Sequence, residues 1–138
     1  MRGGSAAVAG AQYAAGRGRK LRFRANTVRI LRLDGVTTLA FGDQGEAPSV
    51  GVLLSVSENN DEQARNLGID GLYFEAIGAN VSGYHLILNL SCEERLVRLS
   101  MKGGLKDLDE AIEIEVVDDT IQTATLQQTI EMMAAHVQ

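Results

Sequence analysis

The sequence has one cysteine, one proline and no tryptophan among its 138 residues. The lone Cys92 cannot form an internal disulfide, so the fold must rely on its hydrophobic core, and a reducing compartment is expected. A chain of this length buries about 68–70% of the surface that its unfolded form exposes. No apolar run approaches the ~20 residues of a membrane-spanning helix, so we expect no membrane contact.

The groups that usually carry catalysis are also scarce. His85 and His136 are the only histidines, and the His-x-x-x-His and Cys-x-x-Cys spacings of zinc sites are absent. Cys92 precedes Glu93 and Glu94, whose negative charges disfavour a reactive thiolate. Neighbouring carboxylates occur mainly in predicted loops, where solvation explains them. The sequence therefore predicts no catalytic residue, no metal site and no cofactor, and the protein is not expected to be an enzyme.

Charge is distributed unevenly along the chain. Residues 1–32 hold 8 of the 13 lysines and arginines and no acid, whereas residues 33–138 hold the other 5 and all 18 acids. The basic part could contact nucleic acid, but three Phe, three Tyr and no Trp offer little for base stacking. No nucleic-acid partner is expected. The acidic remainder would attract a basic protein, although acidity also serves ordinary solubility.

Residues 1–19 are rich in glycine and alanine and predict a flexible tail, followed by a single domain over 20–138. In that domain, the alternation of apolar residues slips by one position near Ala25–Asn26, which predicts a bulge or bend. Asp34–Gly35 predicts a type I′ hairpin, because both central residues of that turn need positive φ. The turn fixes the cross-strand pairs Leu33–Val36, Ile30–Leu39 and Val28–Phe41.

Further strands are predicted over 50–56, 72–77, 84–90, 96–101 and 111–117. In 84–90, Tyr84, Leu86, Leu88 and Leu90 are expected on one side. A short helix is expected within 58–68, capped by Asn60 or Asp61 and ended by Gly68. A C-terminal helix of about 18 residues would start after Asp118 or Asp119, and its apolar face would hold Leu126, Ile130, Met133 and Val137.

These patterns predict an α+β fold. We expect a mainly antiparallel sheet of about six to seven strands, with a short connecting helix and one amphipathic C-terminal helix packed on a sheet face. The absence of a βαβ rhythm favours antiparallel pairing.

Four segments add a resemblance to a known family. FRANTV stands at 23–28, AFGD at 40–43, DEQARNLGIDGLYFE at 61–75 and SGYHLI at 82–87. In this order, and with the C-terminal helix, they resemble the immunity protein 10 family of bacterial polymorphic toxin systems over about residues 21–135. The resemblance implies a cytoplasmic bacterial protein that binds and neutralises a cognate toxin domain stoichiometrically and without a cofactor. The toxin domain is expected to be basic.

We place the hypothetical contact surface on Asp61, Glu62, Asp70, Tyr73, Glu75 and Tyr84. Carboxylates would steer and pair with a basic partner, while tyrosines could supply buried anchors. Each tyrosine could equally belong to the core, and Gly68 to Asp70 could simply form a turn. The alternative function is a small-ligand-binding or enzymatic α+β domain with a pocket between sheet and helix. A homodimer stays open, because an exposed edge strand can pair with a second copy.

Overall fold

The computed structural model describes residues 20–44, 48–58, 62–104 and 110–137. Nine strands in this part form two sheets, and two helices accompany them. The strands are β2 (Lys20–Ala25), β3 (Thr27–Leu33), β4 (Val36–Gly42), β5 (Gly51–Ser57), β6 (Leu72–Ile77), β7 (Val81–Tyr84), β8 (Ile87–Glu93), β9 (Leu96–Met101) and β10 (Ala111–Val116). The helices are α1 (Glu62–Leu67) and α2 (Thr123–Ala134). The predicted tail over 1–19 and the predicted cap at Asn60 or Asp61 lie outside the described residues.

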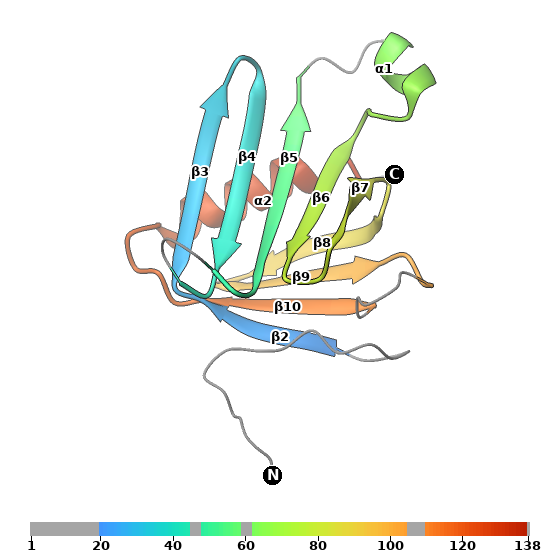
Figure 1. Ribbon diagram of the computed structural model, residues 1–138. Helices are drawn as coiled ribbons and strands as arrows, with labels where there is room; N and C mark the ends of the chain where they lie inside the picture. The colour runs from blue at the N-terminus through green and yellow to red at the C-terminus, as the bar shows by residue number, and fades with distance from the viewer. Residues whose placement is uncertain (1–19, 45–47, 59–61, 105–109, 138) are drawn as a thin grey trace.

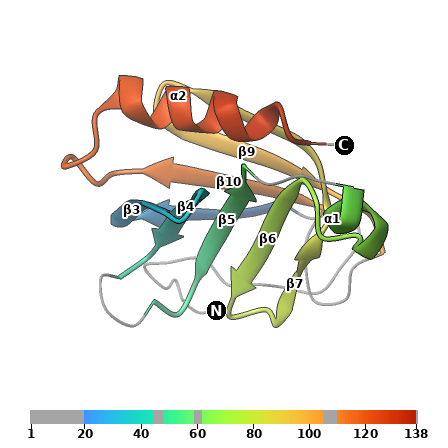
Figure 2. The ribbon, with the colours of Figure 1, turned by 90° about the horizontal axis from the view of Figure 1, so that it is seen from above.

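The two sheets and α2 enclose one hydrophobic core. The four-stranded sheet has the order β2-β10-β9-β8, and the five-stranded sheet has the order β3-β4-β5-β6-β7. Figure 1 shows the five-stranded sheet standing above the four-stranded sheet, with α2 behind it, and Figure 2 shows α2 running along the four-stranded sheet. The α+β class and the helix on a sheet face are thus confirmed. The strands are more numerous than predicted and divide between two sheets, and β2 pairs with β10 in parallel.

The predicted hairpin is confirmed residue by residue. Leu33 pairs with Val36, Ile30 with Leu39, and Val28 with Phe41. Asp34 and Gly35 have φ values of 53° and 77°, as a type I′ turn requires. The next strand, β5, lies at the centre of the five-stranded sheet, which explains its nearly continuous apolar sequence.

The slip in apolar alternation marks the place where the chain changes sheets. β2 ends at Ala25 in the four-stranded sheet, and β3 begins at Thr27 in the five-stranded sheet. Asn26, between them, donates a hydrogen bond of 2.7 Å from Nδ2 to the carbonyl of Asp43. The bend keeps Phe23 and Val28 in the same core, although they have opposite parity in the sequence.

The prediction of one strand over 84–90 is wrong, because the chain changes sheets there as well. β7 ends at Tyr84, and His85 follows with a left-handed φ of 62° before β8 begins at Ile87. The register of β8 on β9 then shifts between Ile87 and Asn89. Leu88, within this irregularity, is 60% exposed. The predicted common face of four residues therefore does not exist.

The C-terminal helix is shorter than predicted and starts later. α2 begins at Thr123 after Gln122, which makes no side-chain capping hydrogen bond. Asp118 is not its cap, because its carboxylate accepts hydrogen bonds from Val28 and Thr120. The predicted apolar face is confirmed: Leu126, Ile130 and Met133 are buried, and Val137, beyond the helix end, packs against the core. Burying side chains of this size contributes about 1.5–3 kcal/mol each.

Candidate functional site

The outer face of the five-stranded sheet, turned away from the core, holds three of the predicted contact residues. Alternation along β6 turns Leu72, Phe74 and Ala76 inward and Tyr73 and Glu75 outward. In the part of the chain that the structure describes, no helix or strand covers this face (Figure 1). Side chains on it are accessible to another molecule.

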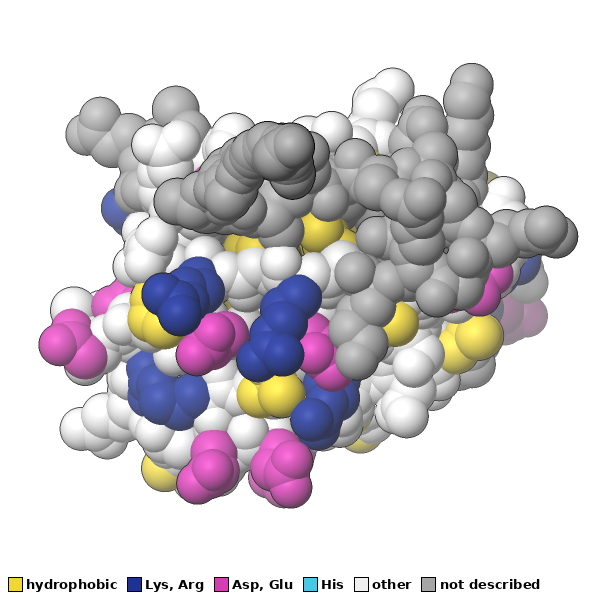
Figure 3. All heavy atoms as spheres, turned by 90° about the horizontal axis from the view of Figure 1, so that it is seen from below, with side chains coloured by type: hydrophobic (Ala, Val, Ile, Leu, Met, Phe, Trp, Pro, Cys, Tyr) yellow, Lys and Arg dark blue, Asp and Glu magenta, His cyan; other side chains and the backbone are white. Residues whose placement is uncertain are grey.

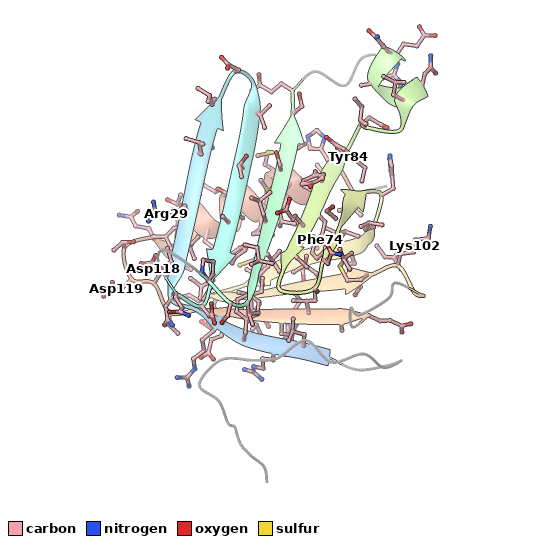
Figure 4. The ribbon with its side chains drawn as sticks, in the orientation of Figure 1. Arg29, Phe74, Tyr84, Lys102, Asp118 and Asp119 are labelled. Carbon is pink, nitrogen blue, oxygen red and sulfur yellow. The ribbon has the colours of Figure 1, made fainter. Side chains whose placement is uncertain are left out.

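Tyr73, Glu75 and Tyr84 form a compact cluster on this face, which we call the tyrosine–glutamate cluster. Tyr73 lies directly opposite Tyr84 in the pairing of β6 with β7, and Glu75 lies opposite Ser82. The two rings are tilted by 59° with their centroids 5.2 Å apart, which is a favourable geometry for an aromatic pair. The Tyr73 hydroxyl donates a hydrogen bond of 2.9 Å to Oε1 of Glu75. Figure 4 labels Tyr84 beside the upper part of β6 and Phe74 lower down.

The electrostatics of the cluster favour a neutral Tyr73 phenol that donates to Glu75. The hydrogen bond to Glu75 raises the pKa of Tyr73, while a hydrogen bond with Ser82 acts in the opposite direction. Tyr73 therefore stays protonated at neutral pH and holds Glu75 in place as a hydrogen-bond acceptor. Two half-buried aromatic rings and one oriented carboxylate can receive a cationic side chain or a mixed apolar and basic surface.

Asp70 lies close to this region but serves the fold. It is only 8% exposed, and its Oδ1 lies 3.2 Å from Nε2 of His85. Asp70 precedes β6, and His85 follows β7, so the pair ties the start of one strand to the end of its neighbour. A buried carboxylate that already contacts His85 is poorly placed to bind a partner. The alternative, in which Gly68 to Asp70 form a turn of the fold, therefore suits Asp70 better.

The remaining predicted contact residues lie elsewhere or cannot be placed. Glu62 is exposed in the first turn of α1, a helix that buries none of its residues. Figure 1 shows α1 beyond the upper ends of β5 and β6. Asp61 lies outside the described residues. Gly68 ends α1 as predicted, with φ 72° and a hydrogen bond of 3.1 Å from its N–H to the carbonyl of Arg65.

The outer face of the four-stranded sheet carries ion pairs instead of an exposed basic stripe. Glu113, 8% exposed, accepts from Nε of Arg98 at 3.2 Å and lies 3.8 Å from Nη1 of Arg22. Arg24 lies 3.5 Å from Glu115. The bond to Glu113 is the main reason that the pKa of Arg98 is raised. Figure 3 shows basic and acidic side chains interleaved on this underside. Two arginines of the basic N-terminal run are therefore neutralised within the protein.

An open groove of about 500 Å³ runs along the edge of this charged face. It is lined by Arg22, Glu93, Glu94, Arg95, Leu96, Glu115, Val116 and Thr123. Arg95 is fully engaged: it donates to the carbonyls of Val116, Ile121 and Asp118 and to the Thr123 hydroxyl. Sequence reasoning missed Arg95, since nothing in its neighbourhood along the chain distinguishes it from a surface arginine. The groove thus offers mainly side chains that already hold the fold.

A small cavity of about 10 Å³ lies just past the end of α2, close to where a ligand pocket was expected between sheet and helix. It is lined by Leu72, His85, Ile87, His136 and Val137. This volume is about that of one water molecule. The described residues contain no group of three or more His, Cys, Asp or Glu side chains that could hold a metal ion. Burial raises the pKa of the Cys92 thiol, which opposes thiolate chemistry.

Comparison with known proteins adds no relative. No family model matches the sequence, and no curated protein matches it either. The resemblance to the immunity protein 10 family therefore stays a prediction that rests on the four quoted segments. Within the described residues, no helix has the length and apolarity needed to cross a membrane.

Proposed function

We propose that this protein is an immunity protein, which binds a cognate toxin domain one to one and neutralises it by contact. The observation that carries the proposal is the tyrosine–glutamate cluster on an uncovered sheet face. Paired tyrosines with an oriented carboxylate have the composition of an interface anchor, because aromatic residues dominate binding energies and charges guide association. The motif resemblance supplies the class of partner.

Both the charge of the chain and the chemistry of the tyrosine–glutamate cluster support a basic partner. The chain has 18 acids against 13 lysines and arginines, and the arginines Arg22, Arg24 and Arg98 are paired with glutamates. A basic side chain of the toxin domain would lie over the Tyr84 ring and pair with Glu75. The enzymatic alternative has less support, because the groove residues are engaged internally and the cavity beside the helix is small.

The test uses the toxin domain encoded next to this gene. We expect a one-to-one complex by size-exclusion chromatography, and calorimetry should give a Kd that rises about thirtyfold or more in Tyr84→Ala, as for a hot-spot tyrosine. Glu75→Lys should slow association and abolish protection of cells that express the toxin. Glu62→Lys should weaken protection if α1 also takes part.

The matched control is Glu131→Lys, the same charge reversal on an exposed position of α2. It should bind and protect like the native protein. Tyr84→Phe, which keeps the ring, should retain most of the affinity. A neighbouring gene without a toxin domain, or a complex unaffected by both Tyr84→Ala and Glu75→Lys, would refute the proposal.

A further inference from the structure

The edge of the five-stranded sheet at β3 is open to pairing. β3 is the outermost strand, and the Leu33–Val36 pair beside the two-residue turn is hydrogen-bonded between β3 and β4. Alternation then turns the backbone groups of Val28, Ile30 and Arg32 away from β4. The N–H of Val28 is occupied, because it donates a hydrogen bond of 2.9 Å to Oδ2 of Asp118. Among the described residues, the backbone groups of Ile30 and Arg32 have no partner on this side.

The side chains along this edge are also unusual for an exposed strand. Leu31 is 58% exposed and Leu33 is 62% exposed, and both belong to the outer face. Arg29 and Arg32 make no ion pair with any described residue. An edge strand with exposed apolar side chains and free backbone groups is a template for another strand.

We propose that β3 pairs with β3 of a second copy of this protein, antiparallel and around a two-fold axis at Leu31. Ile30 of each copy then lies opposite Arg32 of the other, and the two pairs exchange four backbone hydrogen bonds. Leu31 faces Leu31 in a non-hydrogen-bonded pair, where side chains approach most closely. Leu33 packs against the aliphatic stem of Arg29. The two five-stranded sheets become one continuous sheet.

A second copy is the occupant that these observations favour, because the edge is complementary to itself. The register at Leu31 uses the free groups of Ile30 and Arg32 and leaves the Asp118 bond to Val28 intact. A register centred on Ile30 would instead need the occupied N–H of Val28. Charges of both signs lie at each end of the edge: Arg29, Asp118 and Asp119 at the start of β3 (Figure 4), and Arg32 and Asp34 at its other end.

The contact is small, so the dimer is weak and depends on concentration. One strand pair covers much less than the about 800 Å² per partner of a standard interface. We expect a Kd on the order of 10⁻⁴ M. Such an equilibrium leaves the tyrosine–glutamate cluster of each copy exposed, so this inference stands independently of the proposed function.

Sedimentation equilibrium on the native protein tests the pairing. From about 10 μM to about 1 mM, the mean mass should rise from one chain toward two. Leu31→Lys should weaken association at least tenfold, because it places like charges directly opposite each other. Leu88→Lys is the matched control, since Leu88 is 60% exposed on β8, the edge strand of the other sheet. It should associate like the native protein.

A cysteine cross-link tests the register. In a Cys92→Ser background, Leu31→Cys should form a disulfide-linked dimer, because opposite residues of a non-hydrogen-bonded pair have Cα atoms about 4.5 Å apart, within disulfide range. Leu33→Cys should stay unlinked, because its opposite residue is Arg29. A protein that stays monomeric at about 1 mM overturns the inference. Association lost only in Leu88→Lys, or a link formed by Leu33→Cys and not by Leu31→Cys, overturns it as well.

Discussion

Arg95, in the two-residue turn between β8 and β9, fixes the segment that leads into α2. Its Nε donates to the Val116 carbonyl at 3.2 Å, and its Nη1 donates to the Ile121 carbonyl at 3.1 Å and to the Thr123 hydroxyl at 2.9 Å. These acceptors lie at the end of β10, in the segment that follows it and at the first residue of α2, whose N-cap makes no side-chain hydrogen bond. A guanidinium group has no acceptor atom, so Arg95 does not cap the amides of the first turn of α2; it holds the preceding segment in place by binding its carbonyls.

Replacing this residue should lower stability. Arg95→Lys keeps the charge but loses the planar fork, so some of the carbonyls lose their donor, and we expect a loss of about 1–3 kcal/mol in the free energy of unfolding. Urea denaturation followed by circular dichroism measures it. Lys102→Ala, at an exposed position, should change the value by less than about 0.5 kcal/mol. Equal effects from both variants would contradict the role assigned to Arg95.

At the scale of elements, the sequence predicts what depends on neighbours along the chain. Asp34–Gly35 fixes both a turn and the full register of β3 on β4, because a two-residue loop leaves no freedom in pairing. Parity alone places Tyr73 and Glu75 on one face of β6. Alternation along the chain could not place Tyr84 beside them, because its position opposite Tyr73 depends on how β7 pairs with β6.

What the sequence does not predict is where the chain leaves one sheet for the other. The run over 84–90 has the apolar alternation of one strand, yet the left-handed His85 divides it between two sheets. Histidine is among the residues enriched at positive φ, but a lone His85 within an alternating apolar run is a weak turn signal. Asp118 likewise has the right type for a helix cap, but the amide of Val28, distant in sequence, takes its carboxylate.

The turn between β3 and β4 gives a test at this scale. Gly35 has φ 77°, and a Cβ there would meet nothing closer than 3.6 Å, so any penalty comes from the backbone and not from crowding. Gly35→Ala should therefore cost about 1 kcal/mol, the strain of a left-handed alanine. Thermal unfolding measures the change. Asp34→Asn should be neutral or slightly stabilising, since Asn-Gly also suits a type I′ turn. A neutral Gly35→Ala would exclude this turn type.

At the scale of the whole molecule, Asp118 connects the two sheets. It follows β10 in the four-stranded sheet, and its Oδ2 accepts from the N–H of Val28 in the five-stranded sheet. Its Oδ1 accepts from the Thr120 hydroxyl at 2.6 Å and from the Thr120 N–H at 3.0 Å. The hydrogen bond from the Thr120 hydroxyl, followed by those from the Val28 and Thr120 amides, lowers the pKa of the Asp118 carboxyl.

This lowered pKa predicts a dependence of stability on pH. A carboxyl whose pKa is lower in the folded protein contributes stability above its unfolded pKa of about 4, and the contribution is lost as the pH falls through the folded value. The native protein should be more stable than Asp118→Asn at about pH 6, and the difference should shrink below about pH 4. Denaturation across this range measures it. Asp119→Asn, at the exposed neighbour, should show no such difference, and a gap that persists in acid would contradict the assignment.

The pairing of β2 with β10 determines when the protein can finish folding. The strands of the five-stranded sheet are joined in chain order, so each can add to the one before it as the chain leaves the ribosome. β2, by contrast, pairs with β10, which begins at Ala111, more than three quarters of the way along the sequence. Contacts between such distant segments carry a loop-closure cost and slow folding. Until β10 has been synthesised, β2, with its apolar Leu21 and Phe23, lacks the one strand that pairs with it in the described part of the chain.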